Sequence, residues 1–430
     1  MNHRTTHHAA VVTPWGKINE PASPQVCKQL PATLTPKDGS LDSVDSAALD
    51  SRPDQDRIQS AINGCAAGQA VQLVKGAGDN SAFLSGPLQL KSGVTLWIDD
   101  GVTLFASRNP KDYDNGKGTC GVKSGACLPL ISVKGNNAGV MGIRTGGRQG
   151  TIDGRGDQTM LGKSTTWWEL GENAKKANQV QNSPDLIKVQ NSSEFTLYDV
   201  NLINAAYFHF FSHIVNGLTI WGVRVKSPAN NYKGVPYSTI NAKNTDGIDP
   251  ASSGPITSNI NTDGIDPISS KNVTIAHSNI STGDDNVAIK AYSHKGPAQN
   301  ISVIHNTFEF GHGMSIGSET NGIYDVLVDD LTLNGTENNG VRIKSDSSNA
   351  GEVDGVIYKN VTMTNVKNPI VIDPQYLTGN GSSVPDFAAV TINGLRAVNS
   401  THGSSTLEGY DATHPLGLTL ENVQLDATKV

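Results

Sequence analysis

The chain has 430 residues and a formal net charge of −7, and only 17% of its residues are charged. A net negative chain does not offer the basic face that nucleic-acid binding requires, and no run of about 18 apolar residues is present that would span a membrane. Charge is sparse and forms no long like-charge block, which argues against disorder. Glycine supplies 45 residues, more than the usual share of roughly 7%, and this indicates a fold rich in turns.

Residues 1–26 carry no periodic pattern and are predicted to form an irregular arm, whose histidine-containing start resembles a tag remnant. The arm has no apolar segment of signal-peptide length, so we interpret a secretion signal as removed or absent from this sequence. Residues 27–430 are predicted to form one domain.

Four cysteines occur in two groups, Cys27 with Cys65 and Cys120 with Cys127. Three connectivities are possible and the sequence does not choose among them, so pairing within each group is a working assignment. No CxxC motif is present, which argues against a zinc site. An even number of cysteines in a turn-rich chain favours an oxidising compartment.

A short helix is predicted to begin near Asp50, where a capping residue is followed by Pro53 in the first turn. Ile58 and Ile62 lie four residues apart and form one apolar face, and Gly68 follows the end of the segment. A short amphipathic helix before a strand-rich chain is typical of the cap on an open solenoid end.

Strand patterns then follow in quick succession, at residues 71–74, 83–84, 88–90, 94–98, 102–105 and 150–156. A helical interruption is predicted at about residues 166–177. It contains Trp167 and Trp168, which we interpret as core residues rather than as a surface that stacks on sugar rings.

From about residue 195 the chain repeats one unit, in which two apolar residues flank a third residue and a turn rich in Gly, Asn and Ser follows. The apolar pairs are Phe195/Leu197, Leu218/Ile220, Val273/Ile275, Ile301/Val303, Val326/Val328, Val356/Tyr358, Val390/Ile392 and Leu418/Leu420. Units of this kind bury a face only by stacking on one another. Strands that repeat without intervening helices predict an all-β fold, a single-stranded right-handed parallel β-helix.

Four potential catalytic residues recur at the spacing of the coils. Asp263 precedes Asp284 by 21 residues, Asp285 adjoins Asp284, and His312 follows Asp284 by 28 residues. Neighbouring coils lie about 4.8 Å apart, so residues one coil apart in sequence become neighbours in space. We therefore predict that these four side chains line one cleft.

Arg342 and Lys344 lie about one further coil along the chain and alternate with Ile343, so on a strand both point to the same side. Paired cations of this kind hold a sugar carboxylate, and arginine binds it bidentately. Neighbouring ionised acids raise the pKa of one carboxyl group, which can then protonate a leaving oxygen, while the other carboxylates hold water. The set suits hydrolysis of an anionic glycoside.

Four ordered motifs carry a family resemblance: NTDGIDP, STGDDNVAIK, GHGMSIGSE and VRIKS. Together they resemble glycoside hydrolase family 28, and more closely its bacterial endo-polygalacturonases, from about Cys27 to the end of the chain. The resemblance implies a parallel β-helix of the pectin-lyase-like type that hydrolyses α-1,4 bonds of polygalacturonic acid with inversion. It also implies a secreted enzyme without a metal or cofactor, and we expect a monomer.

The resemblance further implies a role for each matching residue. Asp284 resembles the general acid, Asp263 and Asp285 resemble the pair that activates water, and His312 resembles the residue that supports the acid. Arg342 and Lys344 resemble the binders of the sugar carboxylate. Tyr376, in the segment IDPQY, and Asn261, in NTDGIDP, are further candidates for substrate binding.

NTDGIDP occurs twice, at residues 244–250 and 261–267. Asp263 is about one coil from Asp284, whereas Asp246, its equivalent in the first copy, is 38 residues away. We therefore predict that Asp263 fills the site and that residues 244–260 are an insertion.

Two other functions remain open. A pectate lyase would use the same fold with Ca²⁺ bound to the acidic residues. A non-catalytic solenoid would bind the glycan without cleaving it.

Overall fold

The structure is a computed structural model. It describes residues 8–41, 51–122, 126–144, 148–177, 179, 182–230, 246–247, 260–261, 264–336, 339–377, 381–400 and 403–427, with the backbone alone at 246–247 and 260–261. The chain divides into two compact units. The first contains Pro21–Phe211 and Val223–Asp263, and the second contains His8–Glu20, Ser212–Gly222 and Gly264–Val430.

The first unit contains the predicted helix as α2 (Gln55–Gly64), a few residues later than the sequence indicates. Its apolar face is confirmed, because Ile58 and Ile62 are fully buried. The Lys91 ammonium donates to the carbonyl oxygen of Cys65 at 2.8 Å, just beyond the helix. A cation at this end complements the helix dipole.

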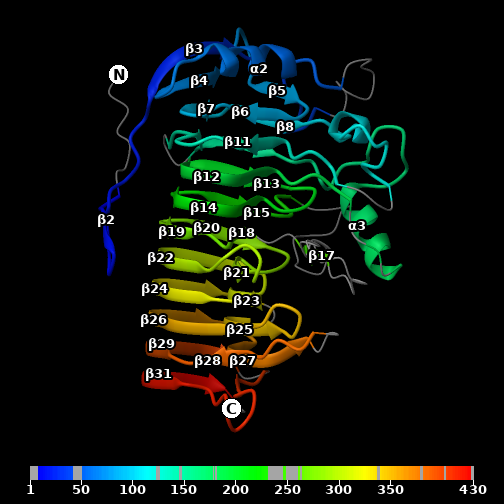
Figure 1. The fold of residues 1–430 in the computed structure, drawn as a ribbon. Helices are drawn as coiled ribbons and strands as arrows, with labels where there is room; N and C mark the ends of the chain where they lie inside the picture. The colour runs from blue at the N-terminus through cyan, green and yellow to red at the C-terminus, as the bar shows by residue number, and fades with distance from the viewer. Residues whose placement is uncertain are drawn as a thin grey trace. The chain divides into compact units, whose positions relative to one another are not determined.

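Three ladders of parallel strands make up most of the first unit (Figure 1). The first ladder consists of β3 (Gln25–Pro31), β4 (Gln69–Val74), β7 (Val94–Ile98), β10 (Gly139–Met141) and β12 (Ile187–Tyr198). The second consists of β5 (Ala82–Ser85), β8 (Thr103–Ala106), β11 (Gly150–Asp153), β13 (Val200–Ile203) and β15 (Arg224–Lys226). The third consists of β6 (Leu88–Leu90), β9 (Ile131–Val133) and the start of β12.

The predicted helical interruption is α3 (Trp167–Lys176), and a short 3-10 helix η1 (Pro110–Tyr113) precedes it. Thr166 and Glu169 form a capping box at the start of α3: the Glu169 N–H donates to Thr166 Oγ1 at 3.0 Å, and the Thr166 N–H donates to Glu169 Oε2 at 2.9 Å. Trp167 and Trp168 are buried, which confirms their interpretation as core residues. Among the described residues no helix is long and apolar enough to cross a membrane.

Both disulfides of the working assignment are present, Cys27–Cys65 and Cys120–Cys127. The first ties β3 to the residue after α2, and the second closes a loop of the first unit.

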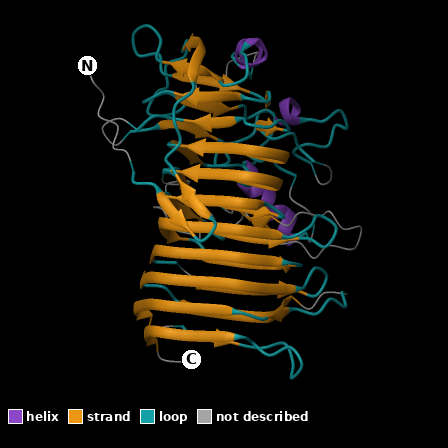
Figure 2. Cartoon of the chain, turned by 60° about the vertical axis from the view of Figure 1, so that its left-hand side comes forward, coloured by secondary structure: helices purple, strands orange, loops and turns teal. Residues whose placement is uncertain are grey.

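The second unit is also built of parallel strands (Figures 1 and 2). One ladder consists of the end of β14 (Phe210–Trp221), then β19 (Lys271–Ala276), β22 (Ala298–Phe310), β24 (Ile323–Asn334), β26 (Glu352–Thr364), β29 (Val390–Ser400) and β31 (Leu418–Ala427). Another consists of β18 (Ile265–Ile268), β21 (Val287–Ala291), β23 (Met314–Thr320), β25 (Asn339–Asp346), β27 (Asn368–Leu377) and β30 (Thr406–Leu407). Two shorter strands, β20 (Asn279–Thr282) and β28 (Asp386–Phe387), pair with β22 and β26.

The repeat predicted from the sequence sets the register of the first of these ladders. Leu218, Val273, Ile301, Val326, Val356, Val390 and Leu418 are successive partners across the strands. The pairs are buried up to Val390/Ile392, whereas Leu420 in the last strand is 45% exposed. The parallel β-helix is therefore confirmed in each unit, and its core is the stack of these rows.

Two pairs of short strands lie outside the ladders. β1 (Val11–Thr13) and β2 (Gly16–Ile18) form an antiparallel hairpin, so the prediction of an irregular arm over residues 1–26 is wrong for this segment. β16 (Asp246–Gly247) and β17 (Ile260–Asn261) also pair antiparallel, with Asp246 opposite Asn261.

Candidate active site

The turn between β20 and β21 carries Asp284 and Asp285, and its backbone stacks on the neighbouring turns. The His312 N–H donates to the carbonyl oxygen of Asp284 at 2.8 Å, and the Gly264 N–H donates to that of Asp285 at 2.9 Å. The hydroxyl of Thr282 donates to the Asp284 carbonyl at 3.1 Å. These contacts confirm that Asp284 and His312 lie one coil apart at the same point of the repeat.

Two glycines allow the His312 turn to lie this close. Gly311 and Gly313 have φ of +69° and +86°, a region that side chains other than glycine disfavour. A Cβ atom at Gly311 would lie 2.5 Å from the Asp284 carbonyl oxygen, and one at Gly313 would clash with the Asn339 carbonyl oxygen. The GHG motif is therefore a requirement of the stacking as well as the carrier of the histidine.

Asp284, Asp285 and His312 form one cluster, in which one polar atom from each residue lies within 4.8 Å of the others. Asp284 Oδ2 lies 3.2 Å from His312 Nδ1, and Asp284 Oδ1 accepts the Asp285 N–H at 2.5 Å. Burial alone would lower the pKa of His312, but the Asp284 carboxylate, helped by Asp285, outweighs burial and raises it. The imidazole therefore favours its charged form beside Asp284.

Asp285 is fully buried and is surrounded by donors. Its Oδ2 accepts from Lys344 Nζ at 2.8 Å, and its Oδ1 accepts from Ser315 Oγ at 2.5 Å, with Arg342 Nη1 3.6 Å away. Burial would raise the pKa of this carboxyl group, but Lys344, Arg342 and His312 together hold it well below its usual range. Asp285 is therefore a fixed anion.

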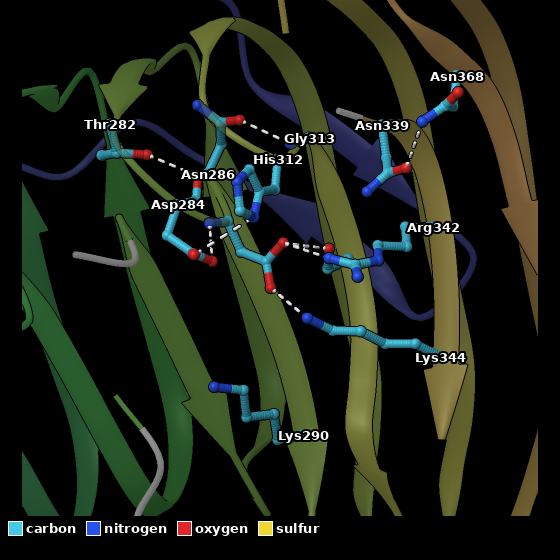
Figure 3. Close-up of polar contacts among 12 residues, drawn as sticks. Thr282, Asp284, Asn286, Lys290, His312, Gly313, Asn339, Arg342, Lys344 and Asn368 are labelled. Atoms are coloured by element: carbon cyan, nitrogen blue, oxygen red, sulfur yellow. Dashed lines mark hydrogen bonds and ion pairs between the residues drawn. The ribbon is translucent and has the colours of Figure 1, made fainter. Parts of the chain in front are cut away.

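Arg342 and Lys344 extend from the same strand, β25, toward Asp284 and His312 (Figure 3). The ring of Tyr376 lies 4.7 Å from the Arg342 guanidinium carbon and 5.2 Å from Lys344 Nζ, which is the arrangement of a cation–π contact. Arg342 Nε is buried and has no hydrogen-bond partner among the described residues. The predicted cations and Tyr376 are thus brought together.

Three polar residues near the cluster were not predicted, although all of them lie within the four motifs. Ser315 is one of them, and it is the strand partner of Arg342. Lys290 and Asp266 are the others, and they form a buried ion pair at 2.8 Å. Alternation along β21 and β23 puts Lys290 and Ser315 on the outward side, so the sequence contained a signal for them once the register was known.

The structure does not describe the side chains of two predicted site residues. Asp263 lies outside the described residues, and Asn261 is described by its backbone alone. Their roles stay predictions.

The model of the family described as glycosyl hydrolases family 28 matches residues 65–430. The chain belongs to this family. Proteins that are similar to the chain include a polygalacturonase of Ralstonia solanacearum, 44% identical over 97% of this chain and 82% of the relative. An endo-polygalacturonase of Pectobacterium parmentieri is 44% identical over 95% of this chain and 89% of the relative.

Solved structures agree with this family membership. The polygalacturonase from Erwinia carotovora ssp. carotovora matches with a TM-score of 0.80 at 43% identity and covers 96% of both chains. A family 28 exopolygalacturonase from Yersinia enterocolitica matches with a TM-score of 0.64 at 19% identity, which supports the fold alone.

Proposed function

We propose that this family 28 chain is an endo-polygalacturonase, which hydrolyses α-1,4-galacturonosidic bonds inside polygalacturonic acid. The observation that carries the proposal is the cluster of Asp284, Asp285 and His312 beside two buried cations, Arg342 and Lys344. Acids of this kind cleave glycosides, and the cations select a substrate that carries carboxylates. The similarity to relatives named endo-polygalacturonase supports the same substrate and an internal point of attack.

In the proposed mechanism Asp284 and His312 share one proton, which Asp284 passes to the leaving oxygen, and the charged imidazole is favoured only while Asp284 is ionised. The contact with His312 at 3.2 Å keeps the Asp284 carboxyl oriented. Asp285 acts as an anion that orients the attacking water together with Asp263. Inverting enzymes usually separate their two carboxyl groups by about 6.5–9.5 Å. Asp284 and Asp285 are closer than this, with polar atoms within 4.8 Å of each other, so we propose that inversion depends on Asp263 as a further acid that holds the water.

The sugar carboxylate is proposed to bind Arg342 and Lys344. Both side chains extend from β25 and carry the positive charge that a sugar carboxylate would bind. Tyr376, which already covers both cations, would pack against the sugar ring, and Asn261 is proposed as a further polar contact.

We further propose that the protein works outside the cell as a monomer, with residues 27–430 as its catalytic domain. Two disulfides fit an oxidising compartment. Polygalacturonic acid would be its partner, and the net charge of −7 gives a nucleic acid little to bind.

The test is the size distribution of products from polygalacturonate over time. Endo-hydrolysis yields a falling series of intermediate oligomers from the first minutes, and exo-hydrolysis would yield short products alone. A lyase would generate the ultraviolet absorbance of an unsaturated uronate and lose activity with a chelator. Binding without new reducing ends would identify a non-catalytic module. In this structure Arg342 and Lys344 place two positive charges beside Asp285, and their repulsion of a Ca²⁺ ion disfavours the lyase.

A further inference from the structure

Ser315 is a fully buried hydroxyl beside the reacting groups, and neither the four motif roles nor the proposed mechanism uses it. It lies on β23, where its strand partners are Ala288 on one side and Arg342 on the other. Its Oγ donates to Asp285 Oδ1 at 2.5 Å, and both residues are buried, with 1% of the Asp285 side chain exposed. A short bond from a neutral hydroxyl to a carboxylate is of the charge-assisted kind.

The two oxygens of Asp285 have different anchors. Lys344 reaches Oδ2 at 2.8 Å from the end of a four-carbon stem, whereas Ser315 reaches Oδ1 from a side chain with a single rotatable heavy-atom torsion. Arg342, at 3.6 Å from Oδ1, is beyond hydrogen-bond distance. A lysine alone fixes one oxygen and leaves the carboxylate plane free to turn about it. Ser315 is therefore the contact that fixes this plane.

We propose that Ser315 is a positioning residue, which orients the carboxylate plane of Asp285 so that its remaining lone pairs face the attacking water. Each carboxylate oxygen has about two acceptor sites, so the donors on Oδ1 and Oδ2 leave others open for a water molecule. The inference rests on the proposed function, because it concerns how Asp285 acts in hydrolysis. A water held even slightly out of line reacts more slowly, while binding of the sugar is unaffected.

The test compares Ser315→Ala with Ser302→Ala. Ser302, on β22 of the same unit, is equally buried, and its Oγ has no hydrogen-bond partner among the described residues. We expect Ser315→Ala to lower kcat on polygalacturonate by about 10- to 100-fold, the range for a hydrogen bond to a charged group. KM should stay within about twofold of the wild type, and the Tm should match that of Ser302→Ala. Ser302→Ala should keep the wild-type kcat.

A third variant separates the hydroxyl from packing. Ser315→Thr keeps the donor but adds a methyl group to a filled site, so its kcat should exceed that of Ser315→Ala if the hydroxyl is what matters. If Ser315 only fills space, Ala is the milder change and the order is reversed. That reversed order would overturn the proposal. So would a kcat for Ser315→Ala within about twofold of the wild type, or a lower kcat that comes with a lower Tm. A wild-type protein that releases no oligogalacturonates would instead overturn the proposed function itself.

Discussion

Two buried aspartates, one in each unit, differ in the direction of their pKa shift. Asp153 ends β11 in the first unit, and burial followed by the neighbouring Asp157 raises its pKa to about 7. Asp285 follows β20 in the second unit, where burial acts in the same direction but Lys344 and Arg342 reverse it. Burial is common to both sites, so the charge of the residues beside each aspartate decides its ionisation state.

The neighbours differ because of local geometry. Arg155 lies two residues after Asp153, and its N–H donates to Asp153 Oδ1 at 2.8 Å. Its guanidinium donates to the Ala106 carbonyl oxygen, and its charge lowers the pKa of Asp153 less than burial and Asp157 raise it. Around Asp285 the cations come from β25, whose outward side chains reach back across β23. An anion suited to catalysis therefore arises where strand register brings cations to an acid, and not wherever an acid is buried.

The largest effect is expected from removing the acid next to the fixed anion. Asp284→Asn takes away the proposed proton donor, and general-acid catalysis contributes up to about 10,000-fold to the rate. The variant should lose nearly all turnover on polygalacturonate at an almost unchanged Tm, because a carboxyl group in a cleft supports little packing. Asp153→Asn, the matched change in the other unit, should keep most activity. An Asp284→Asn variant within about tenfold of the wild type would exclude Asp284 as the donor.

A somewhat smaller effect is expected from removing the lysine beside Asp285, which leaves this aspartate, like Asp153, without a lysine partner among the described residues. Lys344→Ala removes the main cation beside Asp285, so the pKa of Asp285 should rise and the acid limb of the activity profile should move to higher pH. It should also raise KM, and kcat/KM should fall by about 100-fold or more, as expected when one partner of a buried pair is lost. The loss should shrink on a methyl-esterified substrate, which lacks the charge.

The control for this change is Lys359→Ala, which removes an exposed lysine 3.5 Å from Asp329 in the same unit. Exposed pairs contribute about 0–1 kcal/mol, so neither activity nor Tm should change appreciably. Equal losses on the charged and the esterified substrate would point to a structural role for Lys344.

The raised pKa of Asp153 predicts a pH-dependent stability rather than an effect on rate. The folded chain keeps the Asp153 proton up to about pH 7, whereas an unfolded aspartate loses it near pH 4. The folded state therefore binds more protons between these values, and stability falls as the pH rises through this window. Asp153→Asn removes the titration, so its Tm relative to the wild type should increase by a few degrees from pH 4 to pH 8.

Asp79→Asn, on an exposed turn of the same unit, is the control for this measurement. Its Tm difference from the wild type at the two pH values gives the baseline for an exposed Asp→Asn change. A constant difference for Asp153→Asn as well would show that Asp153 is already ionised at neutral pH in the folded protein.

Much of the fold follows from periodicity in the sequence, because stacking requires an apolar residue in the same row of each coil. The row from Leu218 to Leu418 was predicted in this way and is in register throughout. The hairpin of β1 and β2 was not, since strands of three residues contain too little alternation to recognise. Its position depends on contacts within the unit, which local sequence does not encode.

The sequence predicted those site residues whose side chains have a recognisable chemistry, namely the acids, the histidine and the cations of the motifs. Asp284, His312 and Lys344 were found by their spacing of about one coil. Ser315 and Lys290 were missed because a serine or a lysine on a strand has no distinct signal until the residue opposite is known. Their partners, Asp285 and Asp266, lie 30 and 24 residues away, so only the register identifies them.

The smallest effect is expected from the first copy of the duplicated motif. The backbone of Asp246 pairs with Asn261, and Gly264, which follows Asp263 directly, donates its N–H to the carbonyl oxygen of Asp285 at 2.9 Å. The backbone of the second copy therefore contacts the turn that carries the acids, whereas the first copy is followed in sequence by Gly254 and Pro255, and proline is disfavoured in a central strand. An insertion of this kind costs little, because loop-closure entropy grows slowly with length.

We therefore expect Asp246→Asn to retain most of the wild-type kcat and KM, and Asp263→Asn to be nearly inactive at a similar Tm. Both changes replace a carboxylate by an amide of the same size, so each is the control for the other. Initial rates of reducing-end release from polygalacturonate give the comparison. The opposite ranking would mean that Asp246 supplies the water-activating acid and that the second copy is the insertion.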